Sequence, residues 1–115
     1  MTTTAKTLSF VIPSYNMEAY LDRCVNSLLS AHRTDDLEIL IVDDGSKDGT
    51  LAYAQKLERN NPGIVRAIHQ ENKGHGGAVN TGIEAATGKY VKVVDADDWV
   101  GPESLEDVLA TLREE

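Results

Sequence analysis

The sequence predicts an α/β fold in which about four strands of a parallel sheet alternate with helices. Four short apolar runs rich in β-branched residues are separated by segments whose apolar residues recur at helical spacing. Strands that alternate with helices form a parallel sheet through right-handed crossovers. The chain has 115 residues, enough for one domain with one core, so residues 1–115 are expected to form a single domain.

The first strand is expected over residues 8–12, an apolar run that Pro13 closes. Asn16 is the expected N-cap of the first helix, because its side chain can accept hydrogen bonds from free backbone N–H groups. The apolar residues of this helix are Leu21, Cys24, Val25, Leu28 and Leu29. Cys24 is the one cysteine of the chain, which excludes an internal disulfide and predicts a buried, reduced thiol.

The second strand is expected over residues 38–42, after a turn at Asp35 and Asp36. It ends in a second acidic pair, Asp43 and Asp44, and a loop with two glycines follows over residues 44–49. The second helix ends near Asn60. Its apolar residues are Leu51, Ala54 and Leu57.

The third strand is expected over residues 64–68 and is weakened by Arg66. A polar, glycine-rich loop over residues 69–77 leads to the third helix, and Gly88 is expected to stop that helix. The inward stripe of the helix is Ala78, Val79, Gly82, Ile83 and Ala86.

The fourth strand is expected over residues 90–94, as a buried strand that runs directly into the carboxylates of Asp95, Asp97 and Asp98. The last helix opens at Gly101 and Pro102, with proline in its first position. Its apolar face is Leu105, Val108, Leu109 and Leu112.

The composition excludes several classes of protein. The formal net charge is −8 and the pI is about 4.7, which argues against a nucleic acid as the main partner. No apolar run approaches the ~20 residues that a membrane span requires, and residues 1–6 lack the apolar core of a secretory signal. The cytoplasm is therefore the expected location.

The residues that stand out follow strand ends, and a parallel sheet brings such ends to one edge. Pro13 and Tyr15 follow the first strand, Asp44 ends the second, and Asp95 and Asp97 follow the fourth. Ligands of open parallel sheets bind beyond the carboxyl ends of the strands. The sequence therefore predicts one site at this edge.

Asp95 and Asp97 are two residues apart, so in an extended segment both side chains point to the same side. Two such carboxylates form a hard-oxygen site for Mg²⁺ or Mn²⁺, and these cations are usually shared with substrate phosphates. The spacing fits a solvated acidic turn equally well. Asp98 could also replace either ligand.

The other edge residues also have two interpretations. Asp44 could accept hydrogen bonds from a base or a ribose, or only form a turn. The ring of Tyr15 could stack on a base or pack on the first helix. Lys73 and the glycines after it approach a helix N-terminus, which favours an anion, although the segment matches no phosphate-binding fingerprint.

Four blocks of the sequence together resemble the family 2 glycosyltransferases, in the right order over residues 8–99. The first block is Phe10-Val-Ile-Pro-Ser-Tyr-Asn16, and the second is Glu38-Ile-Leu-Ile-Val-Asp-Asp-Gly-Ser46 with Asp48 and Thr50. The third block runs from Asn72-Lys-Gly74 to Asn80-Thr-Gly82. The fourth contains Gly88-Lys-Tyr90 and Asp95-Ala-Asp-Asp98.

This resemblance implies a GT-A fold, in which a Rossmann-like half that binds a nucleotide-sugar precedes a half that binds the acceptor. It implies that Pro13 contacts the nucleotide, that Tyr15 stacks on its base, and that Asp44 hydrogen-bonds the base, typically uracil. Lys73 would lie near the nucleotide. The chain is expected to be the donor-binding part of a truncated catalytic domain, with an open sheet edge through which it could self-associate.

The resemblance also implies the reaction. Asp95 and Asp97 would be the DXD pair, which holds the ribose and a divalent metal, Mn²⁺ or Mg²⁺, on the diphosphate. A hydroxyl of a carbohydrate or lipid-linked acceptor would displace the nucleoside diphosphate with inversion. The catalytic base is expected beyond Glu115, and a longer protein could act at the inner face of the membrane.

Two other functions fit parts of the pattern. A receiver-like phosphoacceptor domain also has acidic residues at strand ends, but its acidic pair follows the first strand, where Pro13-Ser14-Tyr15 stands here. A non-catalytic nucleotide-binding or oligomerisation module differs from the enzyme only in what lies beyond Glu115. A dinucleotide-dependent dehydrogenase is disfavoured, because no glycine fingerprint follows the first strand.

Overall fold

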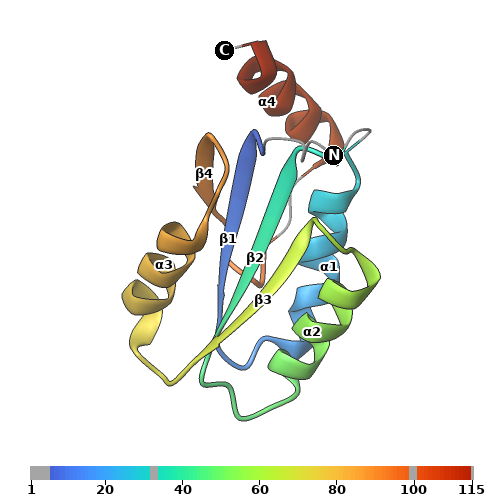
Figure 1. Ribbon diagram of the computed structural model, residues 1–115. Coiled ribbons are helices and arrows are strands. Elements are labelled where there is room, and N and C mark those ends of the chain that lie inside the picture. Colours follow the sequence, from blue (N-terminus) through green and yellow to red (C-terminus); the bar gives the residue numbers. More distant parts are fainter. Residues whose placement is uncertain (1–5, 32–33, 99–100, 115) are drawn as a thin grey trace.

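The computed structural model confirms the alternation of strands and helices along the chain, and it describes residues 6–31, 34–98 and 101–114 (Figure 1). Trp99, at the end of the matched blocks, lies outside these ranges. The elements are β1 (Leu8–Ser14), α1 (Glu18–Leu29), β2 (Leu37–Asp44), α2 (Thr50–Asn60), β3 (Val65–Gln70), α3 (Gly74–Ala85), β4 (Tyr90–Val93) and α4 (Pro102–Glu114).

The four strands form one parallel sheet in the order β3-β2-β1-β4. Helices α1 and α2 lie on one face of the sheet and α3 lies on the other (Figure 1). Alternate residues of the central strands face the two layers: Phe10 and Ile39 belong to the core that includes α1 and α2, whereas Val11 and Leu40 belong to the core under α3. Both faces of β1 and β2 are therefore buried, as their apolar runs predict.

β1 does not end before Pro13, as the sequence analysis expected, but continues through Pro13 to Ser14. β1 can include Pro13 because β4 pairs only with the part of β1 that precedes it. The carbonyl of Val11 accepts a hydrogen bond from Val94 N–H at 2.9 Å, so the backbone groups of Pro13, two residues later, face the same side. The β1–β4 ladder ends at Val11 and Val93, so no strand requires an N–H from Pro13 there.

The third strand and the third helix also differ from expectation. β3 extends to Gln70, because His69 and Gln70 continue the parallel pairing with Asp43 and Asp44. α3 begins at Gly74, so the connection between them is only residues 71–73. The expected glycine-rich loop is therefore mostly strand and helix, and its last glycines lie in the first turn of α3.

Two residues expected to bound helices do something else. The N-cap of α1 is Met17, and Asn16 precedes it with a φ of 54°. α3 ends at Ala85, and Gly88 lies beyond it against β1. The Gly88 N–H donates to Ser9 Oγ at 2.8 Å, and a Cβ on Gly88 would lie 2.5 Å from that oxygen. Gly88 is therefore required for close approach of two chain segments.

Four apolar positions expected to be inward are exposed. Ile83 on α3 is 47% exposed and Val108 on α4 is 50% exposed. β4 is an edge strand rather than a buried one, and its Val91 and Val93 are exposed. No helix within the described ranges is long and apolar enough to cross a membrane.

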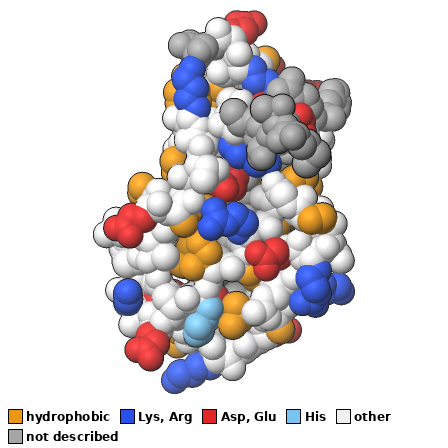
Figure 2. All heavy atoms as spheres, viewed as in Figure 1, with side chains coloured by type: hydrophobic (Ala, Val, Ile, Leu, Met, Phe, Trp, Pro, Cys, Tyr) orange, Lys and Arg blue, Asp and Glu red, His pale blue; other side chains and the backbone are white. Residues whose placement is uncertain are grey.

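A polar contact joins α4 to the residue that precedes β2. Arg113 on α4 makes a bidentate contact with buried Asp36, with nitrogen–oxygen distances of 2.8 Å. α4 lies at the opposite end of the molecule from the loops after β1, β2 and β3 (Figure 1). On the face seen in Figure 2, charged side chains of both signs are interspersed with hydrophobic ones.

Candidate functional site

A cavity of about 310 Å³ lies at the carboxyl edge of the sheet. It is formed where the end of β1 and the residues after it, the last residue of β2 and the turn after β4 meet the first turns of α3. Its lining residues are Pro13, Ser14, Tyr15, Met17, Asp44, His75, Ala78, Asp95, Ala96 and Asp97. The structure thus brings together five of the six residues for which the sequence predicts a binding role, and leaves Lys73 outside the lining.

Asp95 and Asp97 reach this cavity from a turn, not from an extended segment as expected. The Asp98 N–H donates to the Asp95 carbonyl at 2.9 Å, which closes the turn directly after β4. Both Asp95 and Asp97 are exposed and line the cavity, whereas Asp98 is not part of the lining. Both carboxylates therefore line one cavity, as expected, but a turn and not an extended segment places them there.

The two carboxylates fit a divalent cation in their chemistry. Among the described residues, no hydrogen bond or ion pair engages the side chain of Asp95 or Asp97, so their oxygens are available. The described ranges contain no group of three or more acidic, histidine or cysteine side chains that could hold a metal. A hard cation here would therefore take two protein oxygens and complete its coordination with water and phosphate, as Mg²⁺ usually does.

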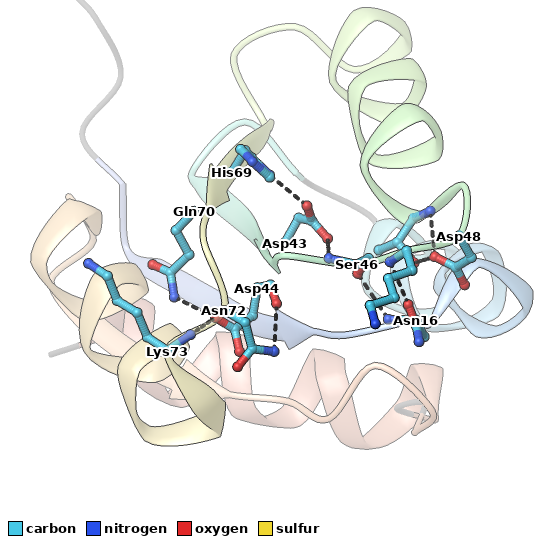
Figure 3. A network of polar contacts seen from close by, with 11 residues as sticks. Asn16, Asp43, Asp44, Ser46, Asp48, His69, Gln70, Asn72 and Lys73 are labelled. Carbon is cyan, nitrogen blue, oxygen red and sulfur yellow. Dashed lines mark hydrogen bonds and ion pairs between the residues drawn. The ribbon is translucent and has the colours of Figure 1, made fainter.

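Asp44 is buried and its carboxylate already holds part of the fold together (Figure 3). Its Oδ1 accepts hydrogen bonds from Gln70 Nε2 at 2.9 Å and from Lys73 N–H at 2.7 Å, and its Oδ2 accepts from Gly74 N–H at 3.0 Å. Burial alone would raise the pKa of Asp44, but these hydrogen bonds outweigh it and lower the pKa below its usual value. The anion expected at this helix N-terminus is thus Asp44 itself.

Lys73 contributes its backbone rather than its side chain. Its N–H binds Asp44, whereas its exposed side chain extends away from Asp44 (Figure 3). Because Lys73 and Gly74 give their N–H groups to Asp44, the α3 terminus has fewer free donors for an external anion than the sequence suggested.

Asp43 forms the turn that the acidic pair was expected to include. Its Oδ1 accepts a hydrogen bond from Ser46 N–H at 3.1 Å, and its Oδ2 lies 2.7 Å from His69 Nδ1 (Figure 3). Asp43 points away from the cavity lining, whereas Asp44 belongs to it. The two members of the pair therefore have separate tasks, as alternation along a strand requires.

The sequence model of the family described as "Glycosyl transferase family 2" matches residues 9–115. The chain belongs to this family. The receiver-like alternative is therefore set aside, and the resemblance of the four sequence blocks is confirmed.

Solved structures of the family give the same fold. S. aureus TarS 1-349 in complex with UDP is 32% identical, with a TM-score of 0.82, and the match covers 94% of this chain and 32% of that one. The mannosyltransferase PcManGT from Pyrobaculum calidifontis, in complex with GDP-Man and Mn²⁺, is 26% identical, with a TM-score of 0.79 and coverage of 94% and 31%. The Rossmann-like half of a GT-A glycosyltransferase is thus the fold of this chain.

Among relatives known by sequence, chondroitin synthase from Escherichia coli is 43% identical over 108 residues, which are 94% of this chain and 16% of that protein. The chain spans about a third or less of the length of the curated relatives it matches.

The sequence predicts no binding role for five of the residues that line the cavity, which are Ser14, Met17, His75, Ala78 and Ala96. Met17 lines the cavity because α1 begins one residue after it, and His75 lines it because α3 begins at Gly74. The available signal for His75 was its position in the segment that joins the third strand to the third helix, which becomes informative once the start of α3 is known.

Cys24 lies beneath the acidic turn and is buried, which confirms the expected free, buried thiol. Its Sγ lies 3.7 Å from the Asp95 carbonyl, to which the thiol can donate. Burial raises the pKa of Cys24 to about 12, and the nearby carboxylates of Asp98, Asp97 and Asp95 act in the same direction. Such a thiol is a packing group and not a nucleophile.

Proposed function

We propose that the carboxyl-edge cavity binds a nucleotide-diphospho-sugar, with a UDP-sugar the favoured donor. The observation that carries this proposal is the convergence of Pro13, Tyr15, Asp44, Asp95 and Asp97 on one cavity in a chain of glycosyl transferase family 2. Two neighbours support it, because their structures hold UDP and GDP-Man respectively.

The base would bind at the β1 and β2 side of the cavity. Tyr15 is 40% exposed, and its ring offers a face on which a planar base can stack, with Pro13 beside it. Asp44 accepts three hydrogen bonds and a carboxylate has about four acceptor positions, so one remains for a base N–H or a ribose hydroxyl. Lys73 lies outside the cavity lining and next to Asp44, and its positive charge would act on the nucleotide from there.

The diphosphate would bind at the β4 side of the cavity, with Asp95 and Asp97 as ligands of Mn²⁺ or Mg²⁺. When bound, the cation neutralises negative charge that develops on the nucleoside diphosphate as it leaves. The neighbour in complex with GDP-Man and Mn²⁺ supports this assignment. Asp95 and Asp97 would fix the position of the cation, and they have free carboxylate oxygens with which to do so.

Sugar transfer is proposed for the whole protein, since this chain spans about a third or less of its relatives. The reaction would be direct displacement with inversion at the anomeric carbon, by a hydroxyl of a carbohydrate or lipid-linked acceptor. We assign no catalytic base among the described residues. The role of this chain would be to hold and orient the donor, and we propose the cytoplasm as its location.

Calorimetric titration with UDP, with and without Mn²⁺, tests the proposal. Mn²⁺ should tighten UDP binding to the unchanged chain. In Asp97→Asn, the increase in UDP affinity that Mn²⁺ causes should be smaller by roughly 10-fold or more, because one charged ligand of the cation is removed. Asp107→Asn is the matched control, since Asp107 is an exposed carboxylate on α4 outside the cavity.

Different results would contradict the donor site and the metal assignment. Absence of UDP binding to the unchanged chain would refute the donor site. UDP binding that is the same with and without Mn²⁺, in both Asp97→Asn and the unchanged chain, would refute the metal assignment and leave the base site standing.

A further inference from the structure

Asn16 has a backbone conformation that few side chains adopt. Its φ of 54° makes it the one residue other than glycine with positive φ in the described ranges. This left-handed region costs free energy for residues with a Cβ, although asparagine tolerates it better than most. Strained residues are retained where the surrounding structure holds them, often at functional sites. Asn16 stands between Tyr15 and Met17, and both neighbours line the cavity.

Two hydrogen bonds from the loop after β2 hold Asn16 in this conformation (Figure 3). Its N–H donates to Ser46 Oγ at 2.9 Å, and its Oδ1 accepts from Lys47 N–H at 2.8 Å. We call Asn16, Ser46 and Lys47 the Asn16 clasp. It joins segments about thirty residues apart in the sequence, so the loop after β2 fixes the backbone of the loop after β1.

The next residues strengthen the same connection. Met17 N–H donates to Thr50 Oγ1 at 2.9 Å and Glu18 N–H to Asp48 Oδ2 at 3.4 Å, while Glu18 Oε1 accepts from Gly49 N–H at 3.0 Å. Neither α1 nor α2 has a hydrogen bond from the side chain of its own N-cap residue. The two helices therefore cap each other across the loops, and the clasp belongs to a rigid unit.

Tyr15 has no such support of its own. Within the described ranges no hydrogen bond engages its hydroxyl, and its side chain is 40% exposed. The position of its ring therefore depends on its backbone, whose next residue is Asn16. We infer that Asn16 is a positioning residue that, through the clasp, sets the ring of Tyr15 for stacking on the nucleotide base. This inference rests on the proposed function.

The loop after β2 contains Ser46 and Lys47 of the Asn16 clasp. The same loop begins directly after Asp44, which lies on the other side of the proposed base site from Tyr15. Gly45 approaches Asn72 so closely that a Cβ would lie 2.8 Å from the Asn72 nitrogen, and Asn72 Nδ2 donates to the Asp44 carbonyl at 3.1 Å. The spacing between the Tyr15 ring and the Asp44 carboxylate is thus set by one loop. A base bound between them requires that spacing.

The test compares a ligand that has a base with one that lacks it. UDP and inorganic pyrophosphate, each with Mn²⁺, are titrated into the unchanged chain, Asn16→Ala, Asn16→Gly, Asn16→Asp and Ser46→Ala. Asn16→Ala should weaken UDP about tenfold, which is part of what base stacking contributes, and leave pyrophosphate affinity unchanged. Asn16→Asp retains an acceptor for Lys47 N–H and should rescue UDP binding.

Asn26→Ala is the matched control, because Asn26 is exposed on α1 and, among the residues that the structure describes, its side chain binds only Asp22, at 3.1 Å. A double-mutant cycle with Tyr15→Ala identifies the route of the effect. If Asn16 acts through Tyr15, Asn16→Ala should cost no further UDP affinity once the ring is gone.

Several outcomes would overturn the inference. Unchanged UDP affinity in a folded Asn16→Ala protein would do so, and so would equal losses for UDP and pyrophosphate, which indicate a general structural effect. If Asn16→Ala does not fold, UDP and pyrophosphate affinities are compared in Asn16→Gly and Ser46→Ala instead. Each of these variants removes one hydrogen bond of the Asn16 clasp, and only Asn16→Gly also relieves the backbone strain. Failure of the unchanged chain to bind UDP would instead refute the proposed function.

Discussion

At the scale of single residues, Asp44 combines a role in the fold with a proposed role in binding. Its carboxylate accepts three hydrogen bonds that fix the start of α3 and the end of β3. Loss of ligand binding after a change at this position therefore cannot be assigned to the ligand contact unless stability is measured too. The role proposed in the base site concerns only the one remaining acceptor position.

Asp44→Asn should lower the free energy of unfolding by about 1–3 kcal/mol, measured by urea denaturation. An amide has one acceptor oxygen and two donor hydrogens, so at least one of the N–H groups of Lys73 and Gly74 would lose its acceptor. Asp107→Asn, on the exposed face of α4, should change stability little. An unfolding free energy for Asp44→Asn equal to that of the unchanged chain would contradict the hydrogen bonds described here.

At the scale of elements, the packing of α3 on β1 depends on Gly82. A Cβ at this position would lie 2.2 Å from Val11 Cγ1. The helix therefore approaches the sheet more closely than any larger residue would allow. The same α3 contains Gly76, where a Cβ would meet nothing within 4 Å, which provides a matched comparison within one helix.

Gly82→Ala should destabilise the protein by about 1–3 kcal/mol through overpacking, and Gly76→Ala should be neutral or stabilise it by up to about 1 kcal/mol through helix propensity. The midpoints of urea denaturation compare the two variants. Combining Gly82→Ala with Val11→Ala should recover part of the loss, because the clashing methyl group is removed. Equal effects of the two glycine changes would show that close packing at Gly82 is unimportant.

The order of the elements was predictable from the sequence because hydrophobic periodicity decides it. The positions of residues that depend on contacts between distant parts of the chain were not predictable from the sequence. Asn16 looked like a helix cap, but Ser46 and Lys47 hold it in another conformation. Gly88 looked like a helix stop, but its neighbour is Ser9, 79 residues away in the sequence.

The location of the site was predictable for the same reason as the fold, since parallel strand ends meet at one edge. Asp95 and Asp97 lie at the cavity although the expected extended geometry was wrong. Met17 and His75 were missed, because their placement depends on the first residue of α1 and α3. The ligand contacts assigned to Pro13 and the other site residues stay predictions.

At the scale of the whole molecule, three carboxylates join segments that are distant in the sequence. Asp44 and Asp48 do so at the carboxyl edge, and buried Glu38 binds Ser9, Thr87 and Arg66 near the other edge. Burial would raise the pKa of Glu38, but hydrogen bonds led by Thr87 N–H lower it below its usual value. The Thr50 hydroxyl is the main cause of the lowered pKa of Asp48.

Stability should therefore fall in acid. A carboxyl whose pKa is lower in the folded state stabilises the fold fully above its unfolded pKa, and this stability is lost as the pH falls through the folded pKa. The ordinary values are 3.8 for Asp44 and Asp48 and 4.5 for Glu38, so the loss should begin below about pH 5. Urea denaturation at pH 7, 5, 4 and 3 measures it. A free energy of unfolding that stays constant down to pH 3 would contradict these three contacts.

The central claim is that one cavity at the carboxyl edge of the sheet holds the nucleoside diphosphate. Amide chemical-shift mapping by NMR, with UDP and Mg²⁺ added to the labelled chain, tests it most directly. The amides of Tyr15, His75 and Asp97 should shift together and saturate at the same UDP concentration, while those of Ser9, Thr87 and Leu112 should not move. Shifts confined to the opposite edge of the sheet, or to the face between β4 and α4, would contradict the claim.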